Sequence, residues 1–217
     1  MASPFHFQIG KIVEKLAKAK ESDSDLRVFG SGSHKYHLNK PADSERIKNF
    51  ELEYSVSLPE CYRAFLKHVG NGGNGYRNSG AGPFYGLFPL GIGVEELLYS
   101  NPEEHLGKEC ILTPEMDQET WHRLTDLLGQ EDISDHDYHR EINKLYAGVL
   151  PIGFQGCSYL HGIVLNGTHK GRVVNLSMDL GMPKFAKGDN FLDWYEKWLD
   201  EIIDGTLIKS TPSWFGY

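Results

Sequence analysis

The sequence predicts an α+β fold in which an antiparallel, twisted sheet is flanked by helices. Apolar residues at helical spacing dominate the chain up to residue 146, and short runs rich in β-branched residues begin only at Val149. No regular alternation of strands and helices appears, which disfavours a parallel sheet. The 217 residues include 40% hydrophobic and 24% charged residues, a composition typical of a globular protein and not of a disordered chain.

The first predicted elements are mostly helical. Apolar residues recur every three or four positions over residues 5–20, which predicts an amphipathic helix. Arg27–Phe29 is a candidate short strand. A second helix is expected over residues 44–54, with Ser44 as its N-cap.

A third helix is expected to begin at Pro59, because proline fits the first turn of a helix, where its missing N–H costs nothing. Its buried stripe consists of Tyr62, Phe65, Leu66 and Val69. Gly70 is expected to end this helix in a left-handed conformation, and the Gly-, Asn- and Ser-rich residues 70–82 form a loop. Gly70, Gly72 and Gly75 match the dinucleotide pattern G-x-G-x-x-G, but that site needs a strand before it and a helix after it. We therefore interpret these glycines as a helix stop and a loop.

The middle of the chain predicts one strand and then helices. Residues 84–88 are apolar and aromatic and predict a strand, and a short helix is expected over residues 94–99. A longer helix should begin at Thr113-Pro114 and turn four apolar side chains inward: Trp121, Leu124, Leu127 and Leu128. Ser134 followed by Asp137 resembles a capping box, which predicts the start of another helix.

The last part of the chain predicts strands and one clear helix. Strands are expected over residues 149–152, 159–165 and 172–176, with the turn Asn166-Gly167 joining the last two into a hairpin. The final helix is capped by Asp189 or Asn190 and stopped by Gly205. Its apolar positions step by three and four: Phe191, Trp194, Tyr195, Trp198, Leu199, Ile202 and Ile203. No repeat and no long linker divides the chain, so we expect a single domain over residues 1–217.

Charge is distributed unevenly along the chain. The formal net charge is −8, and residues 95–146 carry 14 acidic but only 4 basic side chains. A surface of this kind repels nucleic acid phosphates and attracts basic partners. The other interpretation is a solvated acidic face that keeps the protein soluble.

Composition and termini favour a cytoplasmic protein. No apolar run approaches the roughly 20 residues that a membrane helix needs, and residues 1–5 do not begin a secretory signal. The three cysteines are far apart and odd in number, which is typical of free thiols in a reducing compartment: Cys61, Cys110 and Cys157. Without a signal peptide, the sequons at Asn166 and Asn175 should stay unused.

The chemical motifs do not form a catalytic constellation. His136 and His139 share a predicted helix face, and His122 lies on the preceding helix. These histidines either form a metal site or are ordinary surface histidines. Cys61 and Cys157 are candidate nucleophiles only if a histidine or a cation lies beside them. We therefore expect no enzyme, no cofactor and no metal. The terminal aromatic residues Trp214, Phe215 and Tyr217 either fold back onto the core or meet a partner, and the sequence does not decide between these.

One block of motifs resembles a known family. Phe50-Glu51 ends a predicted helix, residues 58–66 read Leu-Pro-Glu-Cys-Tyr-Arg-Ala-Phe-Leu, and Asn71-Gly72-Gly73 follow. This block resembles the signature of the SUKH superfamily, the Smi/Knr-like proteins. The predicted strands and the final helix follow in the order of that family, so the resemblance covers residues 40–205, with 95–146 as an enlarged acidic helical insertion.

The resemblance implies an antiparallel sheet flanked by helices and a binding function without catalytic machinery. Many bacterial members are immunity proteins that neutralise toxins, often nucleases, by direct contact, and fungal members are regulatory interaction proteins in cell-wall signalling. Because a nuclease presents a basic groove to phosphates, an acidic inhibitor surface would suit it. The resemblance therefore predicts a basic toxin as partner, no direct contact with nucleic acid or membrane, and a toxin-facing surface made of Glu131, Asp132, Asp135, Asp137 and Glu141. A regulatory scaffold and a metal- or thiol-dependent enzyme remain the alternatives.

Overall fold

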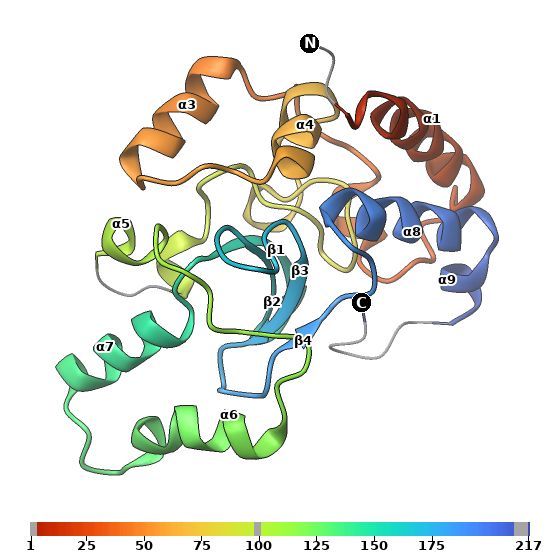
Figure 1. The fold of residues 1–217 in the computed structure, drawn as a ribbon. Coiled ribbons are helices and arrows are strands. Elements are labelled where there is room, and N and C mark those ends of the chain that lie inside the picture. Colours follow the sequence, from red (N-terminus) through yellow and green to blue (C-terminus); the bar gives the residue numbers. More distant parts are fainter. Residues whose placement is uncertain (1–3, 98–100, 211–216) are drawn as a thin grey trace.

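The α+β class predicted from the sequence is confirmed by a computed structural model, which describes residues 4–97, 101–210 and 217 (Figure 1). Its helices are α1 (His6–Ser22), α2 (Ser31–His34), α3 (Ser44–Glu53), α4 (Glu60–His68), α5 (Pro102–His105), α6 (Gln118–Thr125), α7 (Asp135–Leu145), α8 (Phe191–Ile203) and α9 (Thr206–Lys209). Short 3₁₀ turns are η1 (Tyr76–Asn78), η2 (Val94–Glu96) and η3 (Asp126–Gly129). The strands are β1 (Val149–Gly156), β2 (Tyr159–Val164), β3 (Val173–Ser177) and β4 (Lys184–Phe185).

The strands form one antiparallel sheet in the order β1-β2-β3-β4. Leu150 pairs with Ile163, and Ile163 pairs in turn with Val173. Every residue of β3 is buried, the polar Asn175 and Ser177 included, so this strand does not show the apolar–polar alternation of a half-exposed strand. The Asn166-Gly167 turn lies between β2 and β3 as predicted, whereas the two-residue strand β4 was not predicted.

Helices cover the sheet from different sides. Figure 1 shows α1, α3, α4 and α8 gathered on one side of the sheet, with α6 and α7 on the opposite side. Helix α8 packs against both α1 and α4. Its aromatic residues continue the core of α4, since the ring of Phe65 meets Phe191 at 5.1 Å and Tyr195 at 4.8 Å between centroids. Among the described residues, the helices lack the length and hydropathy that a membrane crossing requires.

Two predicted strands are wrong. Arg27–Phe29 is not a strand, because the carboxylate of Asp23 accepts the backbone N–H groups of Arg27 at 2.7 Å and Val28 at 3.2 Å and holds a turn. Residues 84–88 form only two isolated antiparallel bridges, which join Leu87 to Gly80 and to Gly153. The positive φ values of Phe84 (55°) and Gly86 (98°) interrupt the extended backbone there.

Several predicted helix boundaries shift for identifiable reasons. Asp43, and not Ser44, caps α3, because its carboxylate accepts the N–H of Arg46 at 2.6 Å. Helix α6 begins after Asp117, four residues beyond Thr113, for the same reason. Of its predicted inward residues, Trp121 and Leu128 are buried, whereas Leu124 and Leu127 are exposed.

The predicted role of Gly70 is also wrong in detail. Gly70 ends α4 without a positive φ. A Cβ atom at this position would lie 2.7 Å from the Cβ of Leu38 and 2.9 Å from the carbonyl oxygen of Asn39. Glycine is therefore required here by close approach of another segment and not by a left-handed cap.

The final helix is confirmed in detail. Asn190 is its cap, and its side-chain oxygen accepts the N–H groups of Leu192 at 2.8 Å and Asp193 at 3.3 Å. Tyr217 is buried, and its hydroxyl donates to Glu201 at 2.6 Å. The end of the chain therefore folds back onto α8 at this residue, while Trp214 and Phe215 lie outside the described residues.

Candidate partner-binding surface

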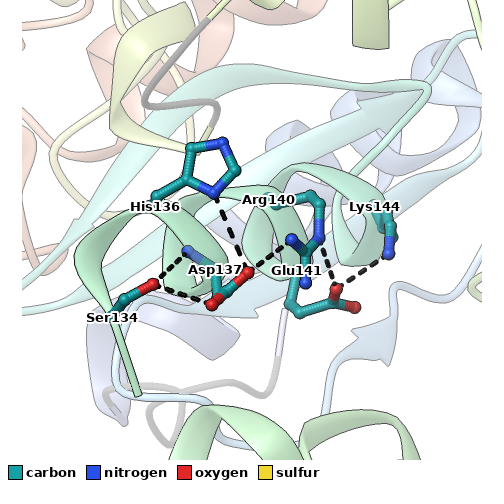
Figure 2. A network of polar contacts seen from close by, with 6 residues as sticks. All are labelled: Ser134, His136, Asp137, Arg140, Glu141 and Lys144. Carbon is teal, nitrogen blue, oxygen red and sulfur yellow. Dashed lines mark hydrogen bonds and ion pairs between the residues drawn. The ribbon is translucent and has the colours of Figure 1, made fainter.

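The five acidic residues predicted to face a partner lie on one short stretch around the start of α7. Glu131 and Asp132 precede the helix, and Asp135 is its first residue. Ser134 is confirmed as the N-cap: its Oγ accepts the N–H of Asp137 at 3.1 Å and donates to the Asp137 carboxylate at 2.8 Å. This local bonding fixes the point at which the helix leaves the loop, as Figure 2 shows.

Asp137 and Glu141 are already engaged within α7. Arg140 pairs with both carboxylates, and the Nζ of Lys144 lies 2.8 Å from Glu141 (Figure 2). Hydrogen bonds from Ser134 and Arg140 hold the pKa of Asp137 below its usual value. A hydrogen bond from Lys144, reinforced by Arg140, lowers the pKa of Glu141 although partial burial opposes it. Both groups are ionised at neutral pH, but their charge is largely compensated along the helix.

The other three predicted residues are exposed and carry uncompensated charge. In the part of the chain that the structure describes, no hydrogen bond or ion pair engages the side chains of Glu131, Asp132 and Asp135. We call these three residues the acidic ridge. Asp135 lies in the first turn of α7, where a negative charge is favoured by the positive end of the helix dipole. The structure thus divides the predicted site into an open part and a part that stabilises the helix.

The histidines of this region do not come together as a metal site. His136 has an 87% exposed side chain, and His122 lies 3.1 Å from Gln118 on α6. His139 lies against the ring of Tyr138. Across residues 4–97, 101–210 and 217, no group of three or more His, Cys, Asp or Glu residues is placed to hold a metal ion.

The cysteines have no catalytic surroundings. Cys61 is buried, and burial raises the pKa of its thiol. Cys157 is exposed in the turn between β1 and β2, whereas His161 is buried against Phe84 and Trp194. Burial lowers the pKa of His161 to about 3, so this imidazole is neutral. A base this weak is a poor activator of the Cys157 thiol.

The motif block that suggested a family is structural. The carboxylate of Glu51 accepts the N–H of Leu58 at 2.8 Å and pairs with Arg63, which fixes the entry into α4. The side chain of Asn71 accepts the N–H of Leu90 at 2.7 Å, and Gly72 takes a positive φ of 66°. These residues hold α3, α4 and the following loop together and expose no reactive group.

Sequence reasoning missed a second surface feature, a set of aromatic side chains around the loop after α4. Phe29, Tyr76, Arg77, Tyr85 and Phe154 lie together although they are far apart in the sequence. Tyr76 is 56% exposed, unlike most large aromatic residues of this chain. The available signal was the pair Tyr76-Arg77 inside a loop of otherwise small and polar residues.

Comparison with known proteins agrees with the structural interpretation. The family model described as the SMI1 / KNR4 family (SUKH-1) matches residues 41–197, from the segment before α3 to the middle of α8. No curated protein and no solved structure matches the chain. The matched range includes the whole sheet and the motif block around α4. The chain therefore belongs to the SMI1 / KNR4 family (SUKH-1).

Proposed function

We propose that this protein is a cytoplasmic immunity protein that binds a basic bacterial toxin and neutralises it by direct contact, with a nuclease as the expected toxin. The observation that carries the proposal is the acidic ridge, three exposed and unpaired carboxylates on a member of a generally non-catalytic family. The wider segment 95–146, with 14 acidic and 4 basic residues, adds to the same negative field.

Electrostatic complementarity supports this choice of partner. A nuclease must attract phosphates and therefore presents lysine and arginine side chains around its active site. A protein that covers such a groove gains from an acidic surface, chiefly through a faster association rate and selection against other partners. The ridge has open carboxylates of this kind, because within the described residues no cation pairs with them and would have to be displaced before they meet a partner.

The five predicted residues receive different roles in this proposal. Glu131, Asp132 and Asp135 contact the toxin. Asp137 and Glu141 hold α7 in place through Arg140 and Lys144, and a partner would have to break those pairs to use them. Neutralising the first group should therefore weaken binding more than neutralising the second group.

Capture of the partner tests this proposal. Tagged full-length protein should recover a basic polypeptide from the source cell, and that polypeptide should lose its toxicity when the two are mixed at equal amounts. The variant Glu131→Gln/Asp132→Asn/Asp135→Asn should need about tenfold more protein for the same protection. The matched control neutralises three exposed acids outside the segment, Glu21, Asp25 and Glu45, and should protect like the wild type.

The same capture separates the alternatives. Recovery of kinases or cell-wall enzymes, without any toxic polypeptide, would contradict the immunity proposal and favour a regulatory scaffold. Equal protection by the two triple variants would contradict the assignment of the acidic ridge, even if a toxin were found.

A further inference from the structure

An open hollow of about 470 Å³ lies where the start of α3 faces the loops that follow α4. Three stretches of the chain line it, residues 39–46, 71–78 and 89–92. We call it the amide groove, because four of its lining residues are asparagines: Asn39, Asn71, Asn74 and Asn78. Its volume falls within the range of known ligand sites.

Asn71 brings an unused hydrogen-bond donor to this groove. The residue is only 7% exposed, and its Oδ1 accepts the N–H of Leu90 at 2.7 Å. This bond fixes which way the amide is turned, because the N–H of Leu90 must face the oxygen and not the NH₂ group. The Nδ2 therefore points away from Leu90, and among the described residues it has no acceptor. A largely buried donor without an acceptor costs free energy, so an oxygen atom of a ligand is favoured beside it.

Two cations line the same groove. The guanidinium of Arg46 donates to the carbonyl of Leu90 at 3.1 Å, so Leu90 holds the side chains of both Arg46 and Asn71 in place. Lys40 is exposed at the groove. Within residues 4–97, 101–210 and 217, neither Lys40 nor Arg46 forms an ion pair. The groove therefore combines two unpaired cations with a donor that is held ready before any ligand arrives, which lowers the entropic cost of binding.

The charges of the groove favour a single carboxylate over a phosphate. Lys40 and Arg46 are positive and Asp43 is negative, so the ionisable residues of the lining sum to a formal charge of +1. One carboxylate balances this charge, whereas a phosphate group carries up to about two negative charges and leaves an excess. Nucleic acid would in addition meet the net charge of −8 of the whole chain. Ile92 also lines the groove and is 40% exposed, so it offers an apolar contact to the methylene groups of an acidic side chain.

We propose that the amide groove is a second contact surface for the protein partner, and that it takes one aspartate or glutamate side chain of that protein between Lys40, Arg46 and Asn71. This inference rests on the proposed function in that the carboxylate belongs to the captured partner. The groove and the acidic ridge then have opposite charge preferences. A partner that meets both must place its basic surface on the ridge and an acidic side chain in the groove, which fixes its orientation and disfavours other proteins.

Affinity measurements on full-length variants with the captured partner test the groove. Asn71→Asp keeps an oxygen for the N–H of Leu90 but replaces the free donor by a negative oxygen, and should raise the dissociation constant by at least about tenfold. Lys40→Glu tests the same point at an exposed position, where folding is not at risk, and should have an effect of similar size. The control is Lys48→Glu, which makes the same change of charge at an exposed residue of α3 outside the groove. It should stay within about twofold of the wild type.

Charge reversal in the partner identifies the group that the groove binds. Among single Asp→Lys and Glu→Lys variants of the partner, one should restore binding to Lys40→Glu within about threefold of the wild-type pair. Rescue by none of them would overturn the proposal, as would a dissociation constant for Lys40→Glu within about twofold of the wild type.

Inorganic phosphate tests the other source of an oxyanion. Titration into the free protein, followed by the side-chain amide resonances of Asn71, should show no saturation below about 1 mM. Saturation in that range, lost in Lys40→Glu, would assign the groove to phosphate and overturn the proposal. Failure of the groove alone leaves the ridge variant impaired. Absence of any basic partner for the wild type overturns the proposed function and this inference together.

Discussion

Replacement of Trp121 should release the acidic segment 95–146 from the sheet. Trp121 is 1% exposed in α6, and its indole N–H donates to the carbonyl of Leu180 at 2.8 Å, in the link between β3 and β4. A second connection comes from Tyr146, whose hydroxyl donates to the carbonyl of Ser177 at 3.1 Å. The segment that carries the acidic ridge is thus attached at both of its helices to the same stretch of chain.

The structure sets the size of the expected effect. Truncation of a fully buried tryptophan to alanine costs about 3–5 kcal/mol of unfolding free energy, through lost apolar burial and the cavity left behind. Trp121→Phe retains most of the apolar surface but leaves the Leu180 carbonyl without its donor, a loss of about 1–3 kcal/mol. Leu124→Ala on the same helix is the control, and because Leu124 is 39% exposed, the cost should stay within about 0.5 kcal/mol.

Urea unfolding followed by circular dichroism measures the free energy, and native-state hydrogen exchange shows where protection is lost. We expect Trp121→Ala to lose most of its protection in α6 and α7, while α8 keeps the protection that the remaining global stability allows. A loss below about 1 kcal/mol would refute the idea that this indole anchors the acidic segment to the rest of the fold. Equal protection in α6, α7, α1 and α8 would show that residues 95–146 do not open separately from the rest of the fold.

Other predictions address packing, pH and thiol chemistry. Gly80→Ala should lower the free energy of unfolding by about 1–3 kcal/mol, because a Cβ there would lie 2.3 Å from the carbonyl oxygen of Gly72. A Cβ at Gly10 would meet nothing within 4 Å, so Gly10→Ala should stabilise α1 by about 0.5–1 kcal/mol. Thermal unfolding measures both changes. Burial lowers the pKa of His161 from 6.5 to about 3. Between these two pH values the unfolded chain therefore binds a proton that the native state does not bind. The free energy of unfolding should consequently fall as the pH drops below about 6.5. A flat stability between pH 7 and about pH 5 would contradict this. A thiol reagent should label Cys157 rapidly in the native protein and should label the two more buried cysteines only in denaturant. Rapid labelling of a second thiol in the native protein would favour the alternative of a thiol-dependent enzyme.

Elements with strong local signals were predictable from the sequence. Helix α8 has an asparagine cap, a continuous apolar stripe and a terminal glycine, so pattern and propensity agree over its whole length. The N-cap of α7 likewise depends on residues three apart and was found from spacing alone. The strands β1, β2 and β3 were predicted because each is short and carries β-branched residues among other apolar ones, although β1 extends four residues beyond the predicted end at Ile152.

Features made by contacts between distant segments were not predictable in the same way. Asp23 prevents a strand at residues 27–29 by accepting backbone N–H groups, and it also accepts the hydroxyl of Tyr36 at 2.7 Å, a contact that no local pattern signals. Leu124 in α6 and Leu127 in η3 follow an apolar period, yet the fold leaves both side chains exposed to solvent.

The candidate site was predictable in composition and not in detail. The excess of acidic residues over 95–146 is visible in the sequence, but the pairing of Asp137 and Glu141 with Arg140 and Lys144 depends on the helix register. The aromatic side chains that meet around the loop after α4 come from residues up to 125 positions apart, Phe29 and Phe154 among them, so only the folded chain reveals this cluster.

The association rate of the captured basic partner tests the central claim most directly. It should be measured by surface-based kinetics for the wild type, the ridge variant and the Glu21/Asp25/Glu45 control, at about 50 mM and about 500 mM salt. We predict that the ridge variant associates about tenfold more slowly at low salt, that the control behaves like the wild type, and that high salt removes most of the difference. Equal rates for the two triple variants at low salt would contradict the assignment of the acidic ridge as the surface that meets the partner.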